Sequence, residues 1–166
     1  MHPLEQGEYS FDSNSVIDFF KTATLPLLDS LFAGRALLSD FVVRELADAQ
    51  IEWRQAQVIP LSTEPELQLF DDIRRNNRAL GSGEVGAITI AKLRRAGLIS
   101  NDRQARNAAT ELNIPVSGSL GILNYSVQVG QISGEEAVRI LTQMILAGAW
   151  LSEELVEQFR RDVLKN

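Results

Sequence analysis

Cysteine is missing from this 166-residue sequence, and histidine is nearly missing. Without cysteine the chain has no disulfide, no thiolate nucleophile and no cysteine-based metal site. The one histidine, His2, lies beside the N-terminus, where disorder is the usual expectation. Catalysis by a serine–histidine pair is therefore nearly excluded.

Long apolar runs and a surplus of basic residues are missing as well. The first residues, MHPLEQGEYS, contain neither a basic segment nor an apolar run, so no secretory signal is visible. No stretch approaches the roughly 18 apolar residues that are needed to span a bilayer. The formal net charge of −6 counts against a nucleic-acid binder that relies on a broad basic surface. We expect a soluble, cytoplasmic protein.

The basic residues that are present gather in one part of the chain. Eight of the sixteen lysines and arginines lie between positions 74 and 106. Two interpretations remain open for this segment. The basic residues are either solvated faces of helices or a local rim that binds phosphate beside an acidic pocket.

Length and composition are those of one globular domain. Apolar residues make up 45% of the chain and charged residues 23%, which is not the composition of a disordered protein. A chain of this length buries a substantial core. No internal repeat or low-complexity tract is visible.

Short predicted strands alternate with predicted helices along the whole chain. The segment 36–38 is apolar but too brief to assign, and 74–83 is the most loop-like stretch. In the segment 40–55 an apolar stripe through Val42, Leu46, Ala49 and Trp53 predicts one helix. This alternation favours an α/β fold with a parallel sheet. The remaining strands are expected at 9–11, 58–61, 98–100 and 114–116, and the remaining helices at 14–22, 25–32, around 67–73, 83–97, 103–112, 118–130, 134–147 and 152–164.

Two acidic residues stand where a predicted strand passes into a helix. Asp12 ends the first strand, and Asp102 follows the strand at 98–100. Either residue would serve as a helix N-cap, and Asp102 could instead pair with Arg106. In open parallel sheets, however, ligands bind beyond the carboxyl ends of the strands. Both positions therefore suit a binding site as well as a cap.

Two further acidic residues belong to helices. Glu45 lies inside the helix predicted over 40–55, so capping does not explain it; the structural alternative is a solvated charge near the border of the apolar face. Glu84 opens a helix that is apolar nearly all round, where the helix dipole favours an acid but desolvation is costly. If the fold brings these four acids together, their oxygens form a site for Mg²⁺ or Mn²⁺ rather than for zinc.

Four short motifs surround the four acids. They are Asp12-Ser13-Asn14, Arg44-Glu45-Leu46, the acid Glu84 at a helix start, and Ser100-Asn101-Asp102. In their order and spacing they resemble the PIN-domain family of metal-dependent nucleases. The resemblance is densest to a prokaryotic subgroup that is similar to VapC-type toxin ribonucleases, through Gly83–Ile88, Asp102–Arg106 and Gly118–Leu123.

The resemblance implies a PIN-like α/β fold, with a short parallel central sheet flanked by helices on both faces. It further implies a single domain over 1–166, with a core over about 9–150 and a C-terminal helix over about 152–164. The family's activity is hydrolysis of phosphodiester bonds in RNA, usually single-stranded, with one or two Mg²⁺ or Mn²⁺ ions. The catalytic and metal-binding acids would be Asp12, Glu45, Glu84 and Asp102, supported by Ser13, Asn14, Asn101, Arg103 and Arg106.

Partners are implied by the resemblance as well. Many proteins of this kind are the toxin of a toxin–antitoxin pair, so a small antitoxin protein and a homodimer are expected alongside the RNA substrate. The final helix carries an apolar stripe, which either packs into the core or serves dimerisation. That stripe consists of Leu155, Val156, Phe159 and Val163.

The sequence departs from the family in three places, and two other functions stay open. Glu84 stands where the wider family carries aspartate, Asn101 stands where the subgroup is often acidic, and the segment before the first strand is longer than usual. The net acidity and Asn101 favour a catalytically silent PIN-fold module that binds nucleic acid or protein. A Mg²⁺-dependent phosphatase is the third reading, but the chain has neither an Asp-x-Asp nucleophile motif nor a phosphate-binding P-loop.

Overall fold

The computed structural model describes residues 1–165, and its centre is a five-stranded sheet in which every strand pair is parallel. The strands lie in the order β3-β2-β1-β4-β5. The predicted α/β class is confirmed, and the unassigned apolar run at 36–38 is one of the strands. Their bounds are β1 (Tyr9–Phe11), β2 (Ala36–Ser39), β3 (Gln57–Ile59), β4 (Gly97–Ile99) and β5 (Val116–Ser117).

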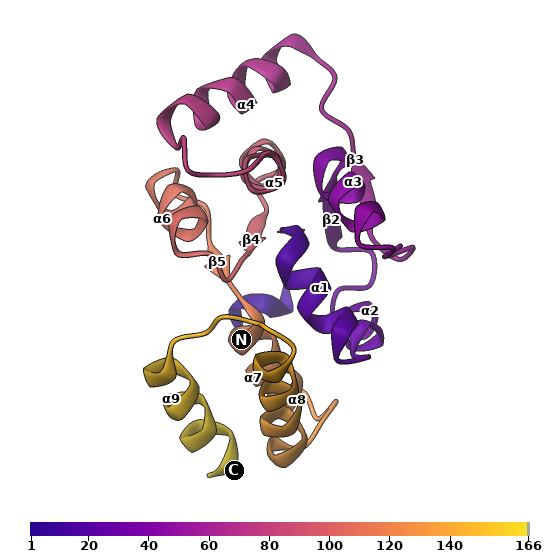
Figure 1. Ribbon diagram of the computed structural model, residues 1–166, viewed down its shortest axis with the longest axis vertical. Coiled ribbons are helices and arrows are strands. Elements are labelled where there is room, and N and C mark those ends of the chain that lie inside the picture. Colours follow the sequence, from indigo (N-terminus) through magenta and orange to yellow (C-terminus); the bar gives the residue numbers. More distant parts are fainter. Residues whose placement is uncertain (166) are drawn as a thin grey trace.

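Helices cover both faces of this sheet, as predicted. Figure 1 shows α5 and α6 on one side of the strands and α1 and α2 on the other. Helix α5 contacts β1, β2 and β4, and α4 packs on it from outside. Over residues 1–165 the helices are α1 (Ser13–Lys21), α2 (Leu25–Leu31), α3 (Asp40–Asp48), α4 (Glu64–Asn76), α5 (Ser82–Arg94), α6 (Arg103–Glu111), α7 (Ser119–Gln128), α8 (Gly134–Leu146) and α9 (Glu153–Leu164), with a 3₁₀ turn at Pro3–Glu5.

Helix α5 is the buried helix that its sequence predicts. Its residues from Val85 to Ala91 are all buried, because the helix is enclosed by the sheet and by α3, α4 and α6. Gly86 allows the close approach to the start of α3: a Cβ atom there would lie 2.7 Å from Ser39 Oγ. The N-terminus of this packed helix is consequently held in a fixed place beside the carboxyl ends of the strands.

The helix predicted over 40–55 is shorter than expected. Helix α3 ends at Asp48, and Gln50 turns the chain with a φ of 60°. Trp53 is buried as the apolar stripe predicted, but from a loop, where it packs edge-on against Phe11 and donates a 2.6 Å hydrogen bond to Asp29. The prediction was wrong because Trp53 is apolar and falls at the position where a continuing helix would place a buried residue, although it is buried from a loop.

The order of the strands creates a switch point between β1 and β4. The chain runs outward from β1 through β2 to β3 and then returns to place β4 on the other side of β1. Phe11 is in register with Ile99, and the Asp12 amide donates a 3.1 Å hydrogen bond to the Ile99 carbonyl. The residues that follow these two strands therefore start side by side, at the place where open α/β sheets bind ligands.

The last three helices pack against one another and form a separate cluster. Helices α7, α8 and α9 contact one another, and α8 also contacts α1. Of the apolar stripe in α9, Val156, Phe159 and Val163 are buried in this cluster, whereas Leu155 is exposed. The stripe thus belongs mainly to the core. None of the helices over residues 1–165 combines the length and apolarity that crossing a bilayer requires.

Candidate active site

Asp12 and Asp102 each cap the helix that follows their strand. Asp12 Oδ1 accepts the Ser15 amide of α1 at 2.8 Å, and Asp102 Oδ1 accepts the Ala105 amide of α6 at 2.8 Å. Capping was the structural alternative for both residues, and it is what their Oδ1 atoms do. Capping also aims both carboxyl groups at the junction between β1 and β4, so cap and site are compatible roles.

Glu84 lies in the first turn of α5 and caps that helix itself. Its Oε2 accepts the Gly81 amide at 2.8 Å, which satisfies the backbone amide of the residue just before the helix. The positive end of the helix dipole adds a favourable interaction for the charge at this position. The side chain is only partly buried, so it keeps access to the space beyond the strands.

Glu45 joins two helix starts from its place on α3. Its carboxylate accepts a hydrogen bond from the Ser13 hydroxyl in the first turn of α1 and a 3.1 Å hydrogen bond from the Gly83 amide in the first turn of α5. The expectation that capping does not explain Glu45 was wrong, because it satisfies amides of another helix. Gly83 makes this possible, since a Cβ atom there would overlap the Glu45 carboxylate.

The acids influence one another electrostatically. Burial raises the pKa of Asp12, which is 2% exposed; hydrogen bonds from Ser100 and Ser15 oppose the rise, and the charge of Asp102 adds to it. Burial also raises the pKa of Glu84, with the Gly81 amide opposing and the charges of Asp102, Asp12 and Glu45 adding. Like charges held near one another disfavour ionisation, and a cation would relieve the conflict.

The donor set suits a hard divalent cation, but it is not a closed metal cage. Carboxylates supply oxygen ligands only, which is the preference of Mg²⁺ and Mn²⁺. Within residues 1–165 no three acidic or histidine side chains stand close enough together to surround an ion as they lie. Each carboxylate is held by a helix-start donor, so closing around an ion requires side-chain rotation.

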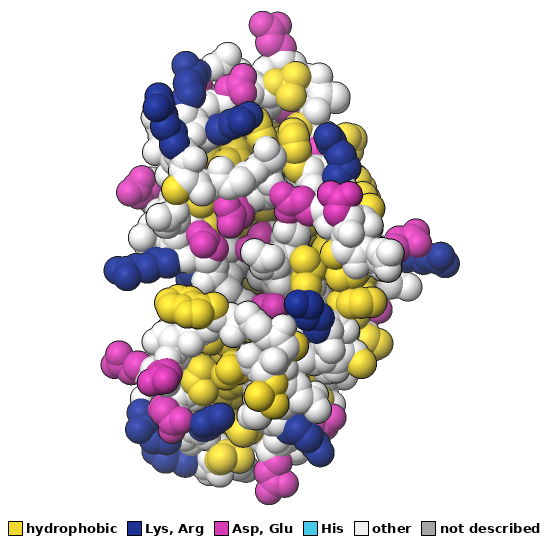
Figure 2. Space-filling model, viewed as in Figure 1, with side chains coloured by type: hydrophobic (Ala, Val, Ile, Leu, Met, Phe, Trp, Pro, Cys, Tyr) yellow, Lys and Arg dark blue, Asp and Glu magenta, His cyan; other side chains and the backbone are white. Residues whose placement is uncertain are grey.

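A groove of about 660 Å³ opens beside Asp12 and Asp102. One wall comes from α1 and the start of α6, and the other comes from the connection between α8 and α9. Lys21 ties the walls together, because its Nζ donates to the Ala147 carbonyl at 3.4 Å. Glu45 and Glu84 do not line this groove. Figure 2 shows acidic side chains gathered across the middle of this face, with hydrophobic surface below them.

Comparison with known families agrees with this geometry. A family profile described as a PIN domain (DUF3368) matches residues 9–165. The chain belongs to the PIN-domain family. It therefore has a nuclease-type fold, and the predicted PIN-domain resemblance is confirmed. Members of this family typically use a divalent metal and bind nucleic acid. The similarity to VapC-type toxins stays a prediction. A search of curated proteins finds no match.

Asp18 is a member of the PIN-domain groove that the sequence reasoning missed. It lies on α1 and lines the groove with Asn14 and Lys21. Burial and the charge of Asp12 raise its pKa from 3.8 to about 6, with Lys21 and Asn101 partly opposing. A signal was present in the sequence, because the polar residues at positions 14, 18 and 21 repeat at helical spacing and lie on one face of the helix.

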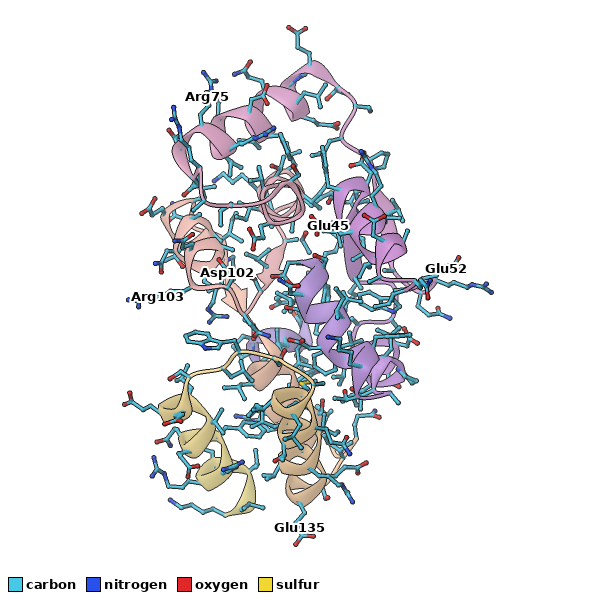
Figure 3. All side chains as sticks on the ribbon, in the orientation of Figure 1. Glu45, Glu52, Arg75, Asp102, Arg103 and Glu135 are labelled. Atoms are coloured by element: carbon cyan, nitrogen blue, oxygen red, sulfur yellow. The ribbon has the colours of Figure 1, made fainter. Side chains whose placement is uncertain are left out.

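The predicted supporting residues divide into two kinds in this PIN domain. Asn14 and Arg103 line the groove, with Arg103 reaching outward in Figure 3. Asn101 also lines it, but its amide group is committed: Nδ2 donates to Ser119 Oγ at 2.8 Å and Oδ1 accepts the Ser119 amide at 2.9 Å. Ser13 holds Glu45, as described above. These contacts hold Ser13, beyond the end of β1, against α3 and hold Asn101, beyond the end of β4, against the start of α7.

Arg106 is neither a solvated surface residue nor a groove residue. Its Nη1 donates to the Ser100 carbonyl at 2.8 Å, and burial lowers the pKa of its guanidinium. The other basic residues of the segment 74–106 are dispersed. Arg75, labelled in Figure 3, pairs with Asp72 near the C-terminal end of α4, and Arg94 pairs with Glu8. Of the eight basic residues, only Arg103 lines the groove.

Proposed function

We propose that this PIN domain is a metal-dependent endonuclease that hydrolyses phosphodiester bonds in single-stranded RNA. The observation that carries the proposal is the convergence of Asp12 and Asp102 at the β1–β4 switch point, with Glu84 within reach of their charges. Neighbouring acids whose charges raise the pKa of Asp12 and Glu84 at a ligand-binding edge suit a cation-dependent reaction. A role as a toxin, with an antitoxin partner, is part of the same proposal and rests on the family resemblance.

Asp12, Glu84 and Asp102 would hold the Mg²⁺ or Mn²⁺, and Glu45 would complete the set. The ion supplies an activated water at neutral pH and stabilises charge on the leaving oxygen. The available oxygens fit this role, because each of the three acids has one carboxylate oxygen that the helix-cap hydrogen bond does not use. The caps use Asp12 Oδ1, Asp102 Oδ1 and Glu84 Oε2.

The chain's own residues would place the substrate. Arg103 and Lys21 line the groove together with Asp12 and Asp102 and would offer positive charge to phosphates along the strand. Asp18, with its pKa of about 6, would hold or release a proton near neutral pH at the groove floor. Ser13 would hold the start of α1 against Glu45, and Asn101, next to Asp102, would be held against the start of α7.

Cleavage of a labelled single-stranded RNA in Mn²⁺ tests the proposal, with wild type compared against Asp102→Asn and Asp48→Asn. Asparagine remains a good N-cap, so Asp102→Asn keeps the α6 start while removing a charged ligand. We expect a loss of cleavage of about a hundredfold or more for Asp102→Asn. Asp48→Asn removes an exposed acid at the C-terminal end of α3, and this variant should cleave the RNA at the wild-type rate.

The silent-module alternative has its own outcome in this assay. It is favoured by the engagement of every acid in a helix-start hydrogen bond. If wild type binds single-stranded RNA but leaves it intact in both Mg²⁺ and Mn²⁺, the nuclease proposal is wrong and the binding module replaces it.

A further inference from the structure

Trp150 is an unusual feature of the groove's second wall. The protein has two tryptophans, of which Trp53 is 5% exposed and Trp150 is 82% exposed. Trp150 lies in the connection between α8 and α9 and lines the same groove as Asp12, Asp18 and Asp102. An indole this large is costly to leave in water, so its exposure at the rim of a polar groove calls for a ligand.

The surroundings of Trp150 specify the chemistry of that ligand. Lys21 and Arg103 line the groove with it, although the protein carries a net charge of −6. Trp150 also lines a second groove of about 610 Å³ on its other side, which Arg160 shares. The indole therefore stands on a ridge between two hollows, each with a cation. A flat aromatic surface beside positive charges is the arrangement that binds single-stranded nucleic acid.

We propose that Trp150 stacks an unpaired base of the substrate and so selects single-stranded over double-stranded nucleic acid. This deepens the proposed function and rests on it for the identity of the ligand. Stacking on an exposed indole needs a free face of the base, which a nucleotide inside a duplex does not offer. Lys21 and Arg103 would meet the phosphates on the side of the acids, and Arg160 would meet the strand beyond the ridge.

Lys21 gives the indole a defined position relative to the acids. Its bond to the Ala147 carbonyl links α1, which Asp12 caps, to the connection that carries Trp150. A base held on Trp150 therefore lies at a set distance along the strand from the phosphate at the acids. Trp150 is a specificity-determining residue in this proposal, and no bond-making step is assigned to it.

Equilibrium binding measures this role separately from cleavage. Fluorescence anisotropy of a labelled single-stranded RNA, and of the same sequence as a duplex, would be recorded in EDTA, where the strand stays uncut. We expect Trp150→Ala to weaken single-strand binding by about tenfold. Trp150→Phe should restore most of the binding, whereas Trp150→Leu should not, because leucine is apolar but has no aromatic face. Duplex binding should change little in any of them.

Leu146→Ala is the matched control, since Leu146 is also 82% exposed near the end of α8 but lines neither groove. It should bind like wild type. Stacking should also quench the intrinsic fluorescence when single-stranded RNA is added, and Trp150→Phe should remove that change because only Trp53 remains.

Several outcomes overturn the proposal. The proposal is wrong if wild type binds no single-stranded RNA, or if Trp150→Ala binds it with unchanged affinity. It is also wrong if Trp150→Leu and Trp150→Phe bind with the same affinity, or if Trp150→Ala loses as much affinity for the duplex as for the single strand. A Trp150→Ala protein that keeps RNA binding but changes its oligomeric state assigns the indole to a protein interface instead. If cleavage is absent while the stacking results hold, the nuclease proposal fails and the stacking site stands.

Discussion

The acidic residues at the two ends of the central strands differ in whether they form salt bridges. At the amino end, Arg94 makes two hydrogen bonds with Glu8, at 2.8 and 3.2 Å, and this pairing raises the pKa of Arg94. At the carboxyl end, none of the acids Asp12, Asp18, Glu45, Glu84 and Asp102 makes a salt bridge within residues 1–165.

This difference separates an acid that is paired with a basic side chain from acids that make no salt bridge in the described part of the chain. Both ends are built from the same strands and the same helix α5, so the backbone does not dictate the pairing. Where the acid is paired, the arrangement is satisfied as it stands. Where acids lie near one another, burial and repulsion raise the pKa of Asp12 and Glu84.

Divalent metal should stabilise the protein through the acids at the carboxyl end of the strands, and the salt bridge at the amino end should play no part in this effect. A Mn²⁺ titration of wild type should raise the free energy of unfolding by about 2.7 kcal/mol at a hundred times the dissociation constant. Asp12→Asn should start more stable, because it removes a buried charge among like charges, and should fail to respond. Thermal melts measure both effects.

Glu8→Gln is the control for this titration, because it breaks the Arg94 pair at the other end of the strands. Its stability should fall by less than about 1 kcal/mol, as for a surface pair, and its response to Mn²⁺ should equal that of wild type. A loss of the metal response in Glu8→Gln, or its survival in Asp12→Asn, would contradict the contrast between the two ends.

Gly83→Ala should damage the carboxyl end through packing. The new Cβ overlaps the Glu45 carboxylate, which must leave the Gly83 amide and the Ser13 hydroxyl. We expect a loss of about 1.5 kcal/mol in urea unfolding. The double variant Gly83→Ala/Glu45→Ala completes a mutant cycle and should lose less than the sum of the single variants. Additive losses would show that Glu45 and Gly83 are independent.

Asp18→Asn should have the smallest effect of these variants, and the effect should appear in how the free energy of unfolding depends on pH. A carboxyl with a pKa of about 6 in the folded protein, against 3.8 ordinarily, binds its proton more tightly when folded. Stability therefore falls as the pH rises through that interval, and the variant removes the fall. After screening at this half-exposed site, we expect the variant to be about 1 kcal/mol more stable than wild type near pH 8 and equal near pH 4.

Thermal melts across this pH range measure the difference, with Asp48→Asn as the exposed control. A difference between Asp18→Asn and wild type that does not vary with pH would mean that Asp18 acts through packing rather than through its charge.

The features predicted correctly from the sequence are those that local rules determine. Asp12 and Asp102 were placed by the order strand, acid, helix, which fixes both a cap and a strand end. The burial of α5 followed from its apolar circumference. Such features need no knowledge of what lies on the far side of the molecule.

The features that were missed depend on packing between distant segments. Nothing near Glu45 in the sequence indicates Gly83, which approaches it only because α3 packs on α5. The exposure of Trp150 depends on how the connection between α8 and α9 packs, whereas the sequence showed only an apolar residue between two predicted helices. The early end of α3 was hidden by the buried Trp53.

The pairing of β1 with β4 also fixes when the site comes into existence during folding. Asp12 and Asp102 meet only after the whole chain between them has closed into a loop, with β2, β3, α4 and α5 inside it. Non-local strand pairing of this kind is slow, because the entropy of loop closure must be overcome before its contacts form. In the unfolded chain the two acids are far apart and repel one another little. The central strand pair and the acidic site are therefore assembled in one folding event, and no partly folded chain that lacks the pair can carry the site.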